Sequence, residues 1–128
     1  MNAFLYYCRT GNIDIVKELL PKVDPSIEDN YAIRWAARND HKDILELLLQ
    51  DPRVDPSVLD NWVIKWAAYY GHKDVVQLLL RDSRVDPSAD DNYAIRWAAE
   101  NGHKDIVELL EQHNYKIDNI RYLELAKI

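Results

Sequence analysis

Three histidines are the residues whose type and spacing come closest to a chemical site. His41, His72 and His103 each begin a His-Lys-Asp tripeptide that recurs at a fixed interval. Histidine beside a carboxylate is typical of zinc sites. We expect no such site here, because the three lie in successive copies of one unit. Packed helices lie about 10 Å apart, whereas zinc ligands lie about 2 Å from the metal. We predict instead that each histidine satisfies backbone groups at a turn, with no metal and no cofactor.

Cys8 is the one cysteine of the chain and the other candidate for chemistry. A thiol beside a distant histidine could act as a nucleophile. Its position in the repeat pattern, however, predicts a packing role. Three glycines in the whole chain could hardly form a phosphate-binding loop. We therefore predict no catalytic residues and no enzyme. A single cysteine excludes an intramolecular disulfide and fits a reducing compartment, so we expect a cytoplasmic protein.

The composition of the chain argues against some classes of partner but does not identify one. The 128 residues carry 16 basic and 22 acidic side chains, for a formal net charge of -6. Nucleic acids and anionic membranes attract basic patches, so we expect neither as a partner. No stretch approaches the roughly 20 apolar residues of a membrane span, and the N-terminus does not read as a signal peptide. With 48% hydrophobic residues, four Trp and eight Tyr, we expect one folded domain over residues 1–128.

Three near-copies of a 31-residue unit fill the middle of the chain. They run over residues 24–54, 55–85 and 86–116 and share the pattern D-P-S-x-x-D-N-x-x-I-x-W-A-A-x-x-x-H-K-D-x-x-x-L-L. A fixed period of this length indicates a solenoid, in which each unit buries its apolar face against its neighbours. The sequence therefore predicts a stack, and stacks of this kind mostly bind other macromolecules.

The second copy predicts two helices and a loop. Asp60-Asn61 precedes a first helix of about two turns and is expected to cap it, while Gly71 suits the left-handed residue that ends it. Asp40 replaces that glycine in the preceding copy, and we expect it to be left-handed too. A second helix follows, apolar over more than one face and thus expected to lie between neighbouring units. The loop after it is rich in turn formers.

The ends of the chain are expected to be caps. Residues 1–23 align as a shortened first unit, with Tyr7-Cys8 standing where later units have paired alanines. The small alanines should let successive first helices pack closely. Glu111 replaces Leu49 and Leu80 and makes the last full unit more polar. We predict that residues 117–128 begin a fifth unit consisting of a single capping helix, Ile120 to about Lys127.

The run from Ala98 to Leu110, A-A-E-N-G-H-K-D-I-V-E-L-L, resembles the core of an ankyrin repeat. The resemblance covers the whole chain and implies an all-α, ankyrin-type solenoid of four helix-turn-helix units plus a C-terminal capping helix. Two features depart from the family pattern: T-P-L-H is replaced at the start of the first helix, and the period is 31 rather than 33. The projecting loops should therefore be short. The variant is similar to ankyrin arrays of amoeba-infecting giant viruses, which would imply the host cytoplasm.

Two groups of side chains on the first helices allow alternative interpretations. Arg34, Lys65 and Arg96 form either a basic strip for an acidic partner or, as we favour, pairs with nearby carboxylates such as Asp29, Asp60 and Asp91. The aromatic residues of the same helices could form a ligand cage, but we expect them to pack between units. They are Tyr31, Trp35, Trp62, Trp66, Tyr93 and Trp97.

The partner site is predicted from four positions that vary between the copies. In the middle copy they hold Val58, Leu59, Tyr69 and Tyr70, and the flanking copies contribute Arg38 and Glu100 as a polar rim. Exposed apolar and aromatic clusters mark binding surfaces, and Tyr is a common hot-spot residue. Packing of both tyrosines against neighbouring helices is the alternative. We thus expect a monomeric, non-catalytic module that binds a partner protein through its concave face and loop tips. The other interpretation is a structural protein that self-associates into a homo-oligomer through the same patch.

Overall fold

A computed structural model describes residues 1–127, and Ile128 lies outside the described residues. The described chain is all-helical, as predicted, and it contains no strands. None of its helices has the length and apolar character needed to span a membrane. In chain order the elements are α1 (Ala3–Thr10), α2 (Ile13–Leu19), the short 3-10 helix η1 (Leu20–Lys22), α3 (Ile27–Arg38), α4 (Lys42–Leu49), α5 (Val58–Tyr70), α6 (Lys73–Leu80), α7 (Ala89–Glu100) and α8 (Lys104–Ala126).

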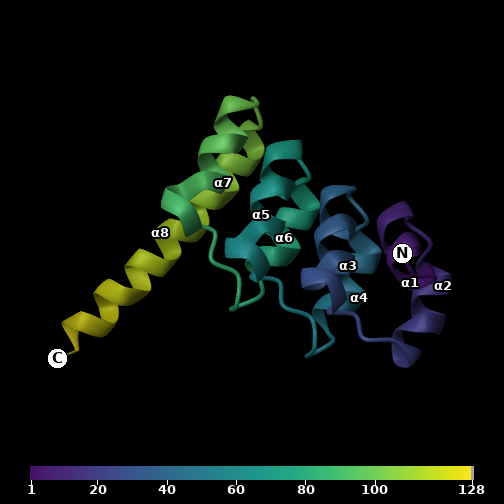
Figure 1. The fold of residues 1–128 in the computed structure, drawn as a ribbon. Helices are drawn as coiled ribbons and strands as arrows, with labels where there is room; N and C mark the ends of the chain where they lie inside the picture. Colours follow the sequence, from purple (N-terminus) through teal and green to yellow (C-terminus); the bar gives the residue numbers. More distant parts are fainter. Residues whose placement is uncertain (128) are drawn as a thin grey trace.

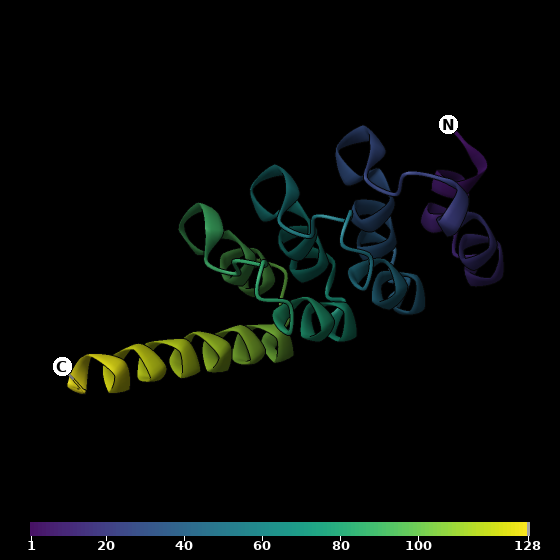
Figure 2. The same cartoon turned by 90° about the horizontal axis from the view of Figure 1, so that it is seen from below.

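The helices form two rows. The inner helices α1, α3, α5 and α7 stand side by side, and the outer helices α2, α4, α6 and α8 lie behind them (Figures 1 and 2). Close approach of the inner row depends on the paired alanines. Ala36, Ala37, Ala67 and Ala68 are fully buried, because each pair lies between two neighbouring units. Larger side chains there would hold the helices apart.

The outer helices supply most of the large apolar side chains of the core. Ile44, Leu45 and Leu48 of α4 are fully buried, as are Val76 and Leu79 of α6. Further leucines of the same helices are partly buried against this core. Burial over more than one helical face is what the sequence predicted for a helix that lies between units.

The Asp-Asn pair before each inner helix does not cap it as predicted. Leu59, Asp60 and Asn61 have φ values of 52°, 55° and 60°, and they form one left-handed turn ahead of the right-handed helix. The equivalent residues of α3 and α7 do the same. A left-handed conformation costs roughly 1–2 kcal/mol for most residues and is more accessible to Asn and Asp. Part of that cost is offset because the backbone N–H of Asn61 donates to the Ser57 carbonyl at 3.0 Å.

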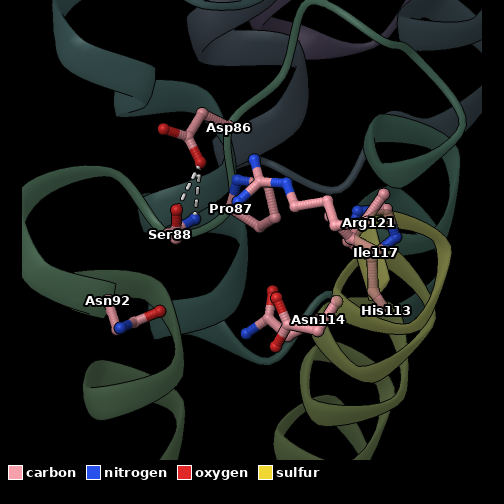
Figure 3. A pocket seen from close by; sticks show the side chains of 9 residues that line it. Asp86, Pro87, Ser88, Asn92, His113, Asn114, Ile117 and Arg121 are labelled. Carbon is pink, nitrogen blue, oxygen red and sulfur yellow. Dashed lines mark hydrogen bonds between the residues drawn. The ribbon is translucent and has the colours of Figure 1, made fainter. Parts of the chain in front are cut away.

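The C-terminal end differs from the prediction of a separate capping helix. Helix α8 continues without a break from Lys104 to Ala126, so no boundary separates residues 116 and 117. The loop sequences D-P-R-V-D-P-S (51–57) and D-S-R-V-D-P-S (82–88) of the earlier units are replaced by H-N-Y-K-I-D-N (113–119), which has no helix-breaking proline. Beside this stretch, Arg121 and Ile117 line a hollow of about 300 Å³ together with Asp86, Pro87 and Ser88 (Figure 3).

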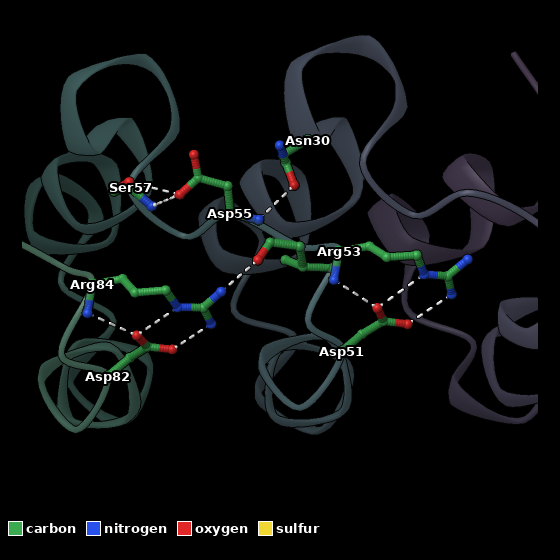
Figure 4. A network of polar contacts seen from close by, with 8 residues as sticks. Asn30, Asp51, Arg53, Asp55, Ser57, Asp82 and Arg84 are labelled. Atoms are coloured by element: carbon green, nitrogen blue, oxygen red, sulfur yellow. Dashed lines mark hydrogen bonds and ion pairs between the residues drawn. The ribbon is translucent and has the colours of Figure 1, made fainter.

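The loops between units are held by a repeated set of polar contacts, which we call the latch (Figure 4). The Arg84 guanidinium donates to both carboxylate oxygens of Asp82, at 3.0 and 2.7 Å, and to the Val54 carbonyl of the preceding loop at 2.7 Å. Arg53, Asp51 and the carbonyl of Val23 repeat the arrangement one unit earlier. Donation by the arginines lowers the pKa of Asp51 and of Asp82.

The asparagines of the left-handed turns complete the latch. Asn61 accepts the backbone N–H of Asp86 at its Oδ1 atom over 2.8 Å, and Asn30 accepts that of Asp55 over the same distance. Both side chains are buried, with relative exposures of 7% and 8%. The residue expected to cap its own helix therefore ties its unit to the next one.

Candidate functional site

The histidines join neighbouring units. His72 Nε2 lies 2.7 Å from the Arg38 carbonyl and His103 Nε2 lies 2.9 Å from the Tyr69 carbonyl. His41 makes the same contact with Arg9 at 2.8 Å. A carbonyl only accepts, so each ring donates from Nε2. The prediction that these histidines satisfy backbone groups is confirmed, but the acceptor lies at the end of the preceding inner helix rather than in the histidine's own turn.

The residue that ends an inner helix is shaped by the histidine of the next unit. Gly71 has a φ of 79°, and a Cβ atom there would lie 2.7 Å from Cε1 of His103. A residue with a Cβ atom would have to adopt the left-handed conformation and displace the ring, so glycine fits best. Asp40 is left-handed, with a φ of 61°, as expected. Its carboxylate lies 3.8 Å from Nδ1 of His72, so the ring stays beside the side chain that replaces glycine.

Cys8 occupies the packing position predicted for it. Its side chain is fully buried in the core. Burial raises the pKa of the thiol to about 12. The thiolate is the nucleophilic form of cysteine, and this environment disfavours it.

The basic column on the inner helices is held in two different ways. Arg34 donates to the backbone carbonyls of Asp29 and Glu28, at 2.9 and 3.1 Å. The predicted pairing with the Asp29 carboxylate is therefore wrong in detail, because the guanidinium closes the left-handed turn instead. The Nζ atom of Lys65 lies 3.4 Å from the Asp90 carboxylate and 3.9 Å from that of Asp60. Carboxylate pairing thus holds for the middle unit.

The aromatic side chains of the inner helices form a continuous set, which we call the aromatic ladder. Its members are Tyr31, Trp35, Trp62, Trp66, Tyr69, Tyr70, Tyr93 and Trp97. The ring centroids of Trp35 and Trp62 lie 6.1 Å apart, and those of Trp66 and Trp97 lie 5.1 Å apart. The ladder therefore crosses both junctions between the three full units. No member is fully buried, and Tyr70 keeps 39% of its surface exposed.

Arg38 is the polar centre of the ladder. Its Cζ atom lies 4.4 Å from the ring centroid of Trp35 and 5.3 Å from that of Tyr70. Its Nη2 atom donates to the Tyr70 hydroxyl at 2.9 Å. Stacking on aromatic faces suits the planar guanidinium and fixes its orientation. The side chain is half-buried, so part of this cation faces solvent.

The structure divides the residues of the predicted patch. Tyr69 and Tyr70 end α5, close to Arg38 at the end of α3, and Glu100 ends α7 on the same side. Leu59 is 50% exposed but begins α5, in the left-handed turn. The rise of the helix separates it from Tyr70 by at least about 12 Å. Val58 is half-buried against the core. The expectation of one continuous patch is thus wrong: the tyrosines and Arg38 lie together, and Leu59 lies apart.

Comparison with known families agrees with the repeat pattern. The family model described as ankyrin repeats (3 copies) matches residues 1–60 and 54–121. The chain is an ankyrin repeat protein. A search of the curated proteins gave no match. The absence of strands means that the loops of this ankyrin repeat chain are turns held by the latch, at least over the described residues.

Sequence reasoning missed two contributors to the surface of this ankyrin repeat stack. The tryptophans were expected to pack between units, and they do, but Trp35 and Trp66 also keep one side towards solvent beneath Arg38. Arg9 of α1 extends the same surface, since it lies 5.8 Å from the centroid of Trp35. The signal was available in the sequence: an invariant Trp three or four residues before a variable position shares its helix face.

Proposed function

We propose that this ankyrin repeat domain binds a partner protein through the inner-helix face, without catalysis. The interacting surface is centred on Arg38, Tyr69 and Tyr70 and is bordered by Glu100. The observation that carries the proposal is the Arg38–Tyr70 contact, in which a 2.9 Å hydrogen bond and two aromatic faces fix a partly exposed cation. Tyr, Trp and Arg are the residues most often found at interface hot spots.

The arrangement also limits the entropy that binding would cost. Ordering a flexible side chain at an interface costs about 0.5–1.5 kcal/mol. Arg38 is already held by Trp35 and by the Tyr70 hydroxyl, and Tyr70 stacks on Trp66 with centroids 5.7 Å apart. A partner would therefore meet side chains that are in place before it arrives. This is the physical reason for preferring Tyr70 over Leu59, whose exposed side chain lies in the left-handed turn at the other end of α5.

Binding rather than chemistry is supported by the state of the reactive groups. The Cys8 thiol is buried and its pKa is raised, and each repeated histidine uses Nε2 to hold a carbonyl of the preceding unit. These side chains therefore hold the fold together, whereas the side chains of the ladder are partly exposed and can contact a partner.

We also propose that the partner is met in a reducing compartment such as the cytoplasm, which would be the host cytoplasm if the chain comes from a virus. The free thiol of Cys8, the one cysteine of the chain, supports this assignment. Fractionation of cells that express the chain would test it.

The functional proposal is tested by comparing variants as baits in native cytosol. Replacing Tyr70 with Ala should weaken capture of a specific partner by about 2 kcal/mol or more, which is the range of interface hot spots. The thermal midpoint of the Tyr70→Ala variant should stay close to that of the parent chain. Glu46→Ala on the outer helix α4 is the matched control, because Glu46 is exposed and remote from the ladder.

Three outcomes separate the alternatives. Loss of one partner with Tyr70→Ala but not with Glu46→Ala supports the proposal. Equal capture by both variants overturns it. Self-association through the same face would appear instead as a molar mass that rises with concentration and falls back in Tyr70→Ala.

A further inference from the structure

The second half of α8 projects beyond the stack (Figures 1 and 2). We call residues 115–126 the arm. Every residue of the arm is exposed, and the last fully or nearly fully buried side chains of α8 are Ile106 and Leu110. At a rise of 1.5 Å per residue the arm is about 18 Å long. It extends beyond its own unit, and near its start Ile117 and Arg121 line the hollow beside Asp86, Pro87 and Ser88.

The arm carries too much apolar surface for a solvated helix. Its exposed large side chains are Tyr115, Ile117, Ile120, Tyr122, Leu123 and Leu125, with relative exposures between 39% and 71%. At 3.6 residues per turn these six point in all directions around the axis. Polar side chains stand between them, but exposed apolar side chains gathered in one segment mark interaction surfaces. The composition of the arm therefore indicates that another surface covers it.

Within the described residues, the last inner helix has one side that no further unit covers. Ala37 and Ala68 are fully buried by the unit that follows them, whereas the equivalent Ala99 is exposed. Ile95 and Val107 are likewise only half-buried. Together these three residues form what we call the end face, and a hollow of about 350 Å³ lies there, lined by Ala99, Gly102, His103, Lys104, Val107 and Glu108. The end face is thus shaped to receive the inner helix of a further unit.

The sequence of the arm resembles such an inner helix. Asp118-Asn119 is again an Asp-Asn pair, like those in the first turns of α3, α5 and α7, although it follows Asp91-Asn92 by 27 residues and not by 31; an apolar stretch follows it as in those helices. In α8 the pair is part of a continuous right-handed helix and not of a left-handed turn. The straight helix carries the arm away from its own end face (Figure 2). An end face that the arm can reach therefore belongs to another molecule.

Charge favours an antiparallel arrangement of two α8 helices. The first half of α8 sets Lys104 against three carboxylates, Asp105, Glu108 and Glu111. The arm and the residue after it set Lys116, Arg121 and Lys127 against Asp118 and Glu124. One half is acidic and the other slightly basic. Two such helices side by side in opposite directions place unlike halves together, whereas a parallel pair would place like halves together.

We propose that the arm of one chain packs on the end face of a second copy, and that the exchange is reciprocal. The result is a two-fold symmetric dimer in which both arms and both end faces are covered, as in exchange of identical elements between protomers. This dimer is independent of the partner surface on the inner helices.

The first test is molar mass by light scattering over a wide range of chain concentrations. The mass should rise with concentration from the 15.0 kDa of one chain towards twice that value. Leu123→Glu, in the arm, should abolish the rise. Tyr70→Ala, on the inner-helix face, should leave it unchanged, and so should the control Lys73→Glu at the exposed start of α6.

A pair of engineered cysteines shows where the arm lies. In the double variant Ala99→Cys/Leu123→Cys, mild oxidation should give covalent dimers on a non-reducing gel. Cys8 will not compete, because it is buried and the pKa of its thiol is about 12. A constant mass of one chain overturns the proposal, and so does an intramolecular cross-link, which would mean that the arm folds back on its own end face. A mass rise that Tyr70→Ala removes and Leu123→Glu does not would assign self-association to the other surface.

Discussion

The same residues occur at the junction between the second and third full units and at the C-terminal end of the stack, in opposite environments. Asn61 is buried and accepts the Asp86 N–H, whereas Asn92 is exposed. Ala68 is fully buried, whereas Ala99 is exposed. The two members of each pair occupy identical positions in the repeat. What differs is the presence of a following unit.

The comparison shows where the stability of the fold resides. In a solenoid each unit contacts only its neighbours, so stability is close to a sum of unit and interface terms. The identical residues of the pattern act largely through the interface terms. The contribution of such a residue to the free energy of unfolding should therefore differ between identical residues at different positions in the stack. Matched substitutions at the junction and at the end test this directly.

The largest difference is expected for the alanine pair. Ala68→Leu should destabilise the fold by about 3 kcal/mol, because overpacking a tight helix junction forces the backbones apart. Ala99→Leu adds the same volume at an exposed position and should change stability by less than about 0.5 kcal/mol. Urea unfolding at concentrations where the mass is that of one chain measures both. Similar losses in the two variants would mean that the end face is covered after all.

A smaller difference is expected for the asparagines. Asn61→Ala leaves the buried N–H of Asp86 without its acceptor, which costs about 1–3 kcal/mol. Asn92→Ala removes no such bond among the described residues and should have little effect on the free energy of unfolding. Thermal and urea midpoints provide the measurement. If Asn92→Ala is as damaging as Asn61→Ala, the asparagine acts through its own left-handed turn and not through the latch.

The smallest effect concerns pH. The Arg84 guanidinium lowers the pKa of Asp82 in the folded chain, so the ionised carboxylate adds stability above the pKa of an unfolded aspartate, about 3.9. That contribution is lost as the pH falls through the lower folded pKa. Asp82→Asn should therefore be less stable than the parent chain at neutral pH, with a gap that narrows in acid. The end of the stack has His113 at the equivalent position and lacks this pair. A gap that stays constant down to strongly acidic pH would contradict the latch.

Part of the candidate site could be predicted from sequence. Variation between the copies singled out Tyr69, Tyr70 and Arg38, and their side chains do lie together on the inner-helix face. Leu59 varied in the same way but lies at the other end of α5, because variation reports freedom from packing and not proximity. The exposed sides of Trp35 and Trp66 were not predicted. Each tryptophan stands three or four residues before the variable positions and so shares their helix face, but its invariance was read as a sign of packing alone.

The sequence by itself determined the repeated helix pairs, the close packing at the alanines and the left-handed Asp40, because each depends on local preference or on a periodic apolar pattern. Only the tertiary structure decided the role of the Asp-Asn pairs. Asp and Asn suit both a helix cap and a left-handed turn. The left-handed turn forms at all three pairs that follow Asp-Pro-Ser, including Asp91-Asn92, which has no following unit among the described residues. Asp118-Asn119 has no Asp-Pro-Ser before it and joins a continuous helix. Local propensity leaves both states open to Asp and Asn; the preceding loop distinguishes them, and the following unit supplies the N–H that Asn30 and Asn61 accept.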